Sequence, residues 1–215
     1  FNRLVQICEK NKTDGVGRIN MDAKTLAKAK GMVMDCPACA QGKGSRTPVG
    51  HRGLDRGRAP GEVLHMDTFF VSLRGRDGTK YMEYCLVAVD PISEYRWTVV
   101  AQKKDDIPSE AEAIVRHCQT MTGNRVKRVY SDGGGEFIDR RFREFCRQNG
   151  TEAHHSPPAT PKMNGIAEAN VQTSKDAART MLMHAHLEEA YWKRAVLHHT
   201  YLWNRTRVGR ETGMT

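Results

Sequence analysis

The chain has 215 residues and 39% of them are hydrophobic, enough for one ordinary domain with appendages around a buried core. This excludes a disordered chain, and no apolar run reaches the roughly 18 residues of a membrane-spanning helix, so we expect no membrane partner. Lys and Arg outnumber Asp and Glu by 34 to 25, a net charge of +9 that favours nucleic acid as a partner.

The ends of the sequence and its cysteines indicate the kind of protein from which the chain comes and the redox state of its thiols. The sequence begins at Phe1 and stops at RETGMT without a signal peptide, so we expect a piece of a longer polyprotein. Its six cysteines are scattered, and only Cys36 and Cys39 are close together. This spacing favours a reduced, intracellular protein over a disulfide scaffold.

Residues 1–60 are predicted to be a small N-terminal appendage. A short helix is expected over 21–33, before the sequence CPACAQGK. Residues 41–61 are rich in Gly, Pro and Arg, as linkers are. We therefore place a domain boundary near residue 60, between a front segment (1–60) and a core domain (61–215).

The core begins with strands and continues with alternating helices and strands. Asp77-Gly78 marks a hairpin turn between the first two strands. The predicted strands are 62–73, 80–90, 95–102, 125–131 and 151–156. The predicted helices are 107–121, 139–150, 166–185 and 188–206, and an irregular loop precedes the third of them. Together they predict an α/β fold, in which helices flank a mixed five-stranded sheet.

Three acids occupy unusual positions in this layout. Asp67 interrupts the apolar strand VLHMDTFF, where a charge is costly unless a cation meets it. Asp132 follows the fourth strand and precedes three glycines, and Glu168 lies in the first turn of a helix. Taken singly, Asp132 is also a common turn residue, and Glu168 also favours the helix dipole.

If the first and fourth strands are neighbours, these acids can converge on one crevice. Three carboxylates held together repel one another and need cations, and hard oxygen ligands suit Mg²⁺ or Mn²⁺. Two such ions can stabilise both the attacking and the leaving oxygen of a phosphoryl transfer. Glycines beside Asp132 would let a phosphate approach the backbone closely.

The helix with Glu168 has two predicted faces. Its core face follows helical spacing and comprises Ala167, Val171, Ser174, Ala178, Met181 and Ala185. The adjacent stripe comprises Glu168, Gln172, Lys175 and Arg179, which could follow a nucleic-acid backbone or be an ordinary solvated face.

The blocks HMDTFF, YSDGGGEF and SPPATPKMNGIAEANVQT, in this order, resemble the integrase catalytic core of copia-like long-terminal-repeat retrotransposons, a family of DDE recombinases. The resemblance implies an RNase H-like fold and metal-dependent DNA 3′-end trimming and strand transfer. It makes Asp67, Asp132 and Glu168 the catalytic metal ligands, with Mg²⁺ or Mn²⁺ as cofactor. It also implies element ends and target DNA as substrates, a homo-oligomer and a nuclear location.

The sequence departs from the family pattern at several positions. Gly133 stands where the family commonly has Asn, and Lys162-Met163 precedes Asn164 where the family often has Gln-Gln. Gln172 replaces a cation of related integrases, whereas Lys175 keeps one. We expect Lys162, Asn164, Gln172, Lys175 and Arg179 to contact DNA.

The family's front module binds zinc through two histidines and Cys-x-x-Cys. Cys36 and Cys39 match the second half, but no histidine precedes His51. Since two thiolates do not complete a tetrahedral site, we favour no zinc here.

Two other functions stay open. One is a degenerate copy that binds DNA or supports assembly without catalysis, which the missing histidines and altered loop favour. The other is a ribonuclease of the same fold.

Overall fold

The computed structural model describes residues 55–74, 78–132, 134–155 and 165–206, together with Lys24, Thr25 and Lys28. The front segment beyond those three residues, including Cys36 and Cys39, lies outside the described residues, as does most of the predicted helix 21–33. Lys162 and Asn164 also lie outside them. Within the described part, none of the helices has the length and apolar character that crossing a membrane requires.

A mixed five-stranded sheet forms the centre of the fold, in the order β3-β2-β1-β4-β5. Three antiparallel strands come first in the chain, and two parallel ones extend the sheet from β1. Their bounds are β1 Val63–Arg74, β2 Lys80–Val89, β3 Arg96–Ala101, β4 Arg128–Ser131 and β5 Glu152–His155. The predicted mixed five-stranded α/β fold is therefore confirmed.

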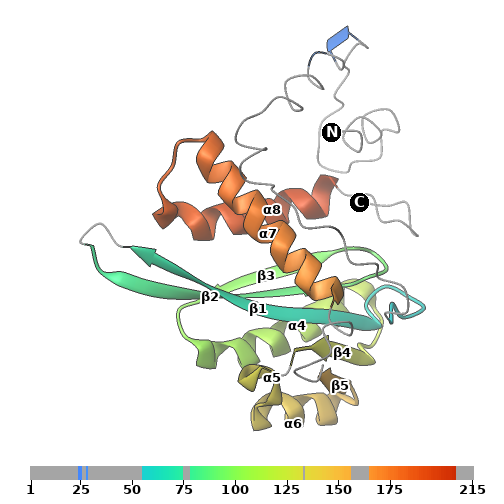
Figure 1. Cartoon of the computed structure of the whole chain (residues 1–215). Coiled ribbons are helices and arrows are strands. Elements are labelled where there is room, and N and C mark those ends of the chain that lie inside the picture. Colours follow the sequence, from blue (N-terminus) through green and yellow to red (C-terminus); the bar gives the residue numbers. More distant parts are fainter. Residues whose placement is uncertain are drawn as a thin grey trace.

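Helices cover both faces of the sheet, as Figure 1 shows, with α4, α5 and α6 on one face and α7 and α8 on the other. The first group is α4 Ile107–Thr122, α5 Gly135–Ile138 and α6 Arg140–Asn149. The second is α7 Gly165–His184 and α8 Trp192–Thr206, and the 3₁₀ turns η1 (Lys104–Asp106) and η3 (Glu189–Tyr191) precede α4 and α8.

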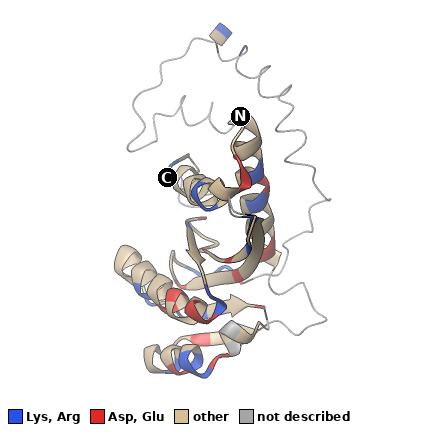
Figure 2. Cartoon of the chain, turned by 90° about the vertical axis from the view of Figure 1, so that its left-hand side faces the viewer, with Lys and Arg blue, Asp and Glu red and all other residues tan. Residues whose placement is uncertain are grey.

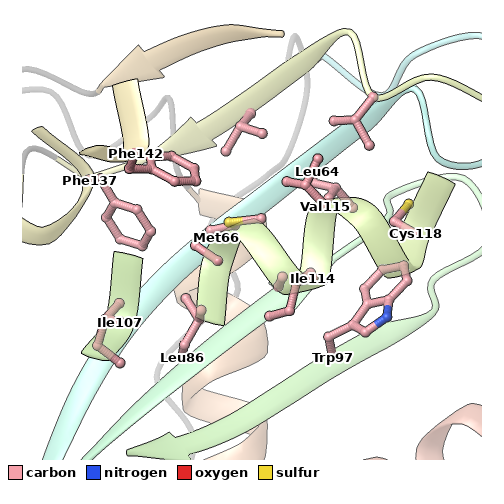
Figure 3. Packing of buried hydrophobic residues seen from close by; sticks show 14 of the residues in the cluster. Leu64, Met66, Leu86, Trp97, Ile107, Ile114, Val115, Cys118, Phe137 and Phe142 are labelled. Carbon is pink, nitrogen blue, oxygen red and sulfur yellow. The ribbon is translucent and has the colours of Figure 1, made fainter. Parts of the chain in front are cut away.

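Strand alternation divides the buried apolar residues between two clusters. On the α4 side, Leu64 and Met66 of β1 pack with Ile114 of α4 and with Phe137 and Phe142, as Figure 3 shows. The other face packs against α7 and α8. There the buried residues are Phe69, Leu73, Cys85, Val87, Val171, Ala178, Leu182, Trp192, Ala195 and Val196.

Helix ends follow local sequence signals. Pro108 lies in the first turn of α4, where its missing N–H costs nothing, and Gly123 ends the helix in the left-handed region. The Asp139 side chain accepts a hydrogen bond from the Arg141 N–H and caps α6. Gly150 ends that helix at a φ of 58°.

Two details differ from the prediction. The four-residue helix α5 was not predicted, because four residues are too few for a periodic pattern. Ala185 was predicted to face the core but is exposed, since α7 ends at His184 and Leu182 fills the last buried position instead.

Residues 55–61 are bonded to the core domain, although the predicted boundary places most of them in the front segment. The Asp55 carboxylate pairs with Arg128 at 2.6 Å and accepts a hydrogen bond from the Tyr130 hydroxyl at 3.0 Å. The Gly61 N–H donates to the buried Asp90 carboxylate. These contacts join the chain before β1 to β4 and to the end of β2.

Candidate functional site

Asp67 lies in the middle of β1, and only 9% of its surface is exposed. Its neighbour two residues on, Phe69, packs against Trp192 on the α7 and α8 side. Because alternate residues of a strand share a face, Asp67 points to that side as well. Its Oδ1 accepts a hydrogen bond from the Thr68 N–H at 2.9 Å.

Asp132 directly follows β4, which is parallel to β1 and next to it. His65 pairs with Tyr130 in this register, and their rings stack with centroids 5.0 Å apart. Two residues further along each strand, Asp67 and Asp132 are therefore neighbours on the same face. The Asp132 Oδ1 accepts from the Gly134 N–H at 3.1 Å.

The backbone of Asp132 is held from β5. The Ser131 hydroxyl donates to the Asp132 carbonyl at 3.1 Å and lies 2.9 Å from Nδ1 of His155. Ser131 has one proton, so both bonds form together only when His155 Nδ1–H donates to the hydroxyl. No local sequence pattern singles out the contact between these two residues, which the in-register pairing of Ser131 with His155 brings together.

Glu168 lies in the first turn of α7, and its side chain is exposed. Its charge nevertheless reaches Asp67. Burial raises the pKa of Asp67 most, and the charges of Asp132 and Glu168 raise it further, to about 7. The Thr68 N–H and the charge of Lys175 oppose this increase. The three acids thus form one electrostatic cluster around a buried carboxylate.

The three carboxylates do not form a complete set of ligands around one metal position. Among the residues that the structure describes, no group of three or more His, Cys, Asp and Glu side chains is placed to hold one metal ion. The donor chemistry still fits a hard divalent cation. Asp67 is buried and is repelled by two other carboxylates, so a cation among them would favour its charged form.

Lys175 differs from its predicted place in an exposed stripe. Its side chain is half-buried, with Nζ 4.6 Å from the centre of the Phe69 ring. Burial raises the pKa of both Asp67 and Cys85, and the charge of Lys175 opposes this increase. Lys175 therefore partly compensates the buried acid.

Gln172 and Arg179 are exposed, but both contact Asp176, which the sequence analysis did not consider. Gln172 Nε2 donates to the Asp176 Oδ1 at 2.8 Å, and Arg179 Nη1 lies 3.6 Å from the same oxygen. Glu168, Gln172 and Arg179 share the exposed side of α7. An acid within this stripe reduces its attraction for phosphate.

A groove of about 500 Å³ opens beside the loop after Asp132. Its lining residues are Lys104, Asp105, Pro108, Gly135, Asp139 and Arg141. A Cβ added at Gly135 would meet no atom within 4 Å, so this position faces open space. Arg141 is also paired with the buried Glu112, at 3.3 Å. The groove thus lies beside the loop that follows Asp132, with two cations and two acids in its lining.

Charges of both signs occur on the described helices, as Figure 2 shows. Residues 55–206 contain 22 Lys or Arg residues and 20 acids, whereas residues 1–54 contain ten and four. The positive charge of the chain therefore comes mainly from residues 1–54.

Residues 57–161 match the family model described as "Integrase core domain". The chain is 32% identical, over 124 residues, to the retrovirus-related Pol polyprotein from transposon TNT 1-94 of Nicotiana tabacum. This alignment covers 58% of the chain and 9% of that polyprotein. The chain spans about a tenth of the length of the curated retrotransposon relatives it matches.

Two solved structures show the same fold. A chain of the simian T-cell lymphotropic virus intasome, in complex with the PP2A regulatory subunit B56 gamma, has a TM-score of 0.58 at 16% identity. That similarity covers 99% of this chain and 72% of the intasome chain. The HTLV-2 integrase catalytic core domain in complex with magnesium has a TM-score of 0.52 at 19% identity, with 74% and 96% covered. Residues 57–161 thus match the integrase core domain, and the chain is similar to the retrotransposon polyproteins that match it in sequence.

Proposed function

We propose that this chain is an integrase core that catalyses metal-dependent trimming of DNA 3′ ends and their transfer into target DNA, with Asp67, Asp132 and Glu168 as metal ligands. The observation that carries the proposal is the buried Asp67, whose pKa burial and the charges of Asp132 and Glu168 raise to about 7. A carboxylate is costly in such a place unless it serves a cation. The HTLV-2 catalytic core domain was solved in complex with magnesium, which supports the choice of ion.

Each acid has its own task in this proposal. Asp67 and Asp132 present oxygens from neighbouring strands, and the Thr68 and Gly134 N–H groups orient those oxygens. Glu168 completes the set from a helix, so a movement of α7 could change the site without disturbing the sheet. Bound Mg²⁺ ions would supply charge for the attacking and leaving oxygens of the phosphodiester.

DNA would approach the loop that follows Asp132, beside which a groove opens with Lys104 and Arg141 as well as Asp105 and Asp139 in its lining. Gly135 leaves room there for a phosphate or sugar. Joining a DNA end to a target requires two DNA segments at one centre, and we propose that the chain works there as a homo-oligomer. Because the target is DNA, we propose a nuclear location. Zinc has no part in this proposal.

A non-catalytic DNA-binding or assembly module is the second candidate. It is favoured by the absence of a closed metal-ligand group among the described residues and by the contacts of Gln172 and Arg179 with Asp176. In that case the chain would keep its fold and its charge but would catalyse no reaction.

Strand transfer with short DNA ends, in Mg²⁺ and in Mn²⁺, tests the first function. We expect Asp132→Asn to reduce the rate at least about 100-fold, because a metal ligand contributes several kcal/mol to phosphoryl transfer. Asn can still accept from the Gly134 N–H, so the fold should persist. Glu152→Gln removes an exposed acid of β5 and is the matched control, with activity near that of the unchanged protein.

Equal activity of Asp132→Asn and the unchanged protein would show that the site is wrong. An unchanged protein that binds DNA but transfers no strands in either metal would support the second candidate. Cleavage of an RNA–DNA hybrid alone would favour a ribonuclease.

A further inference from the structure

Arg96, the first residue of β3, is the largest fully buried side chain of the described core, with 1% of its surface exposed. A buried guanidinium needs hydrogen-bond partners for its charge. Its Nη1 donates to the Ser174 hydroxyl at 3.0 Å, and its Nη2 donates to the Asn170 Oδ1. Both partners belong to α7, the helix that carries Glu168.

Arg96 is itself held by α8. Its guanidinium carbon lies 3.8 Å from the centre of the Trp203 ring, a cation–π contact. Its backbone N–H donates to the Asn204 Oδ1 at 2.9 Å, and the Asn204 amide donates to its carbonyl at 2.7 Å. The sheet and α8 together therefore determine where the guanidinium meets α7.

Asn170 connects Arg96 to the start of α7. While its Oδ1 accepts from Arg96, its Nδ2 donates to the Ile166 carbonyl at 2.7 Å. Ile166 and Asn170 lie two residues before and after Glu168. Two residues correspond to about 200° around a helix, so Asn170 points inward while Glu168 projects outward from the same turn.

We propose that Arg96 and Asn170 are positioning residues that hold the first turns of α7 and thereby place the Glu168 carboxylate opposite Asp67. The importance of this placement for catalysis rests on the proposed function. The stability of the first turns of α7 can be measured whether or not that function is correct. A first helical turn frays easily, because its N–H groups have no partners within the helix. The side-chain contacts of Asn170 supply an anchor from the core.

The test is amide hydrogen exchange over residues 166–172 in the full, metal-free chain. Asn170→Leu removes the acceptor for Arg96 and the donor for Ile166, and we expect exchange there to become at least about tenfold faster. Asn170→Asp restores an acceptor for the guanidinium and should return exchange toward that of the unchanged protein. Arg96→Lys keeps the charge but loses the two-pronged contact, so it is a second variant with the same expected increase.

Thr98→Val is the matched control. The Thr98 hydroxyl lies 2.7 Å from that of Thr200 and also joins β3 to α8, but no contact of it with α7 is found in the described structure. We expect Thr98→Val to lower Tm without faster exchange at 166–172. A second readout is the Mn²⁺ concentration that gives half-maximal strand transfer, which should rise at least about threefold in Asn170→Leu and not in Thr98→Val.

Equal exchange over 166–172 in Asn170→Leu, Arg96→Lys and Thr98→Val would overturn the positioning role, whether or not the chain transfers DNA strands. Full activity of Glu168→Gln would instead count against the proposed function, and the exchange data would be unaffected. The two failures are therefore distinguishable.

Discussion

Asp67 combines a buried strand position with two neighbouring acids. Its pKa is 3.8 in an unfolded chain and about 7 in the fold, so the folded state binds this proton more tightly. The free energy of unfolding of the metal-free protein should therefore fall as pH rises from about 4 to about 7, and stay low above that range. At about 1.4 kcal/mol per pH unit, the loss amounts to roughly 4 kcal/mol.

Asp67→Asn removes this charge and keeps an oxygen for the Thr68 N–H. Without metal, we expect the variant to be more stable than the unchanged protein at pH 8, by about 2 to 4 kcal/mol, and by only about 1 kcal/mol at pH 4.5. Urea unfolding in a chelator at the two pH values measures this difference. If Asp67→Asn were instead less stable than the unchanged protein at pH 8, the Asp67 carboxylate would not be a destabilising charge in the metal-free fold.

At the scale of elements, the chain before β1 is part of the core structure. Asp55 contacts Arg128 and Tyr130 of β4, and its carbonyl lies 2.8 Å from Nε2 of the buried His65 in β1. Burial raises the pKa of Asp55, but the Gly57 N–H, the Tyr130 hydroxyl and the Arg128 charge outweigh it, so the pKa lies below its ordinary value. One residue thereby joins the incoming chain to two strands beside the candidate site.

Asp55→Ala should lower the free energy of unfolding by about 1 to 2 kcal/mol at pH 7. A lowered folded-state pKa stabilises the fold above the unfolded value of 3.8, and this contribution is lost as pH falls below it. The effect of the substitution should therefore be smaller at pH 3. Denaturant titrations at both pH values measure it.

Glu144→Ala provides the comparison, because it removes an exposed ion pair with Arg147 on α6. Exposed pairs contribute little, so stability should barely change. If Asp55→Ala had an equally small effect, residues 55–61 would be only loosely attached to the sheet.

At the scale of the whole molecule, the net charge is unevenly distributed along the sequence. The core domain is nearly balanced, and basic residues are in excess in residues 1–54. Non-specific DNA affinity depends on cations that neutralise phosphates and release counterions. We therefore expect the front segment to supply most of the salt-dependent affinity.

Replacing Lys43, Arg46 and Arg52 together by Gln should weaken binding to a random duplex and reduce the slope of log K against log salt, by about 0.9 for each phosphate that is no longer neutralised. The control replaces three exposed cations of the core by Gln, namely Lys80, Arg140 and Lys193, and should change the slope less. Fluorescence anisotropy between about 50 and 200 mM salt measures both slopes. A larger change in the control would place the DNA-binding charge on the core instead.

The sequence by itself determined the elements of the core domain and their type. The apolar strands around Asp67 and Tyr130 and the helix periodicity around Val171 are strong local patterns, because each reflects one buried face with a fixed period. The unusual positions of Asp67 and Asp132 were also visible, since a charge inside an apolar strand and an acid before glycines both depart from the local pattern. Short features without a period, such as α5, were not predictable.

Tertiary structure decided which distant residues meet. That Arg96 contacts Asn170, that Asp55 contacts Arg128 and that Lys175 lies over Phe69 depends on the order of strands and on how α7 crosses the sheet. No local pattern encodes these pairs, because hydrogen bonds and charge contacts between elements are selected by packing of the whole core. The pKa of Asp67 has the same origin: its sequence neighbours are ordinary, and the fold buries it beside two other acids.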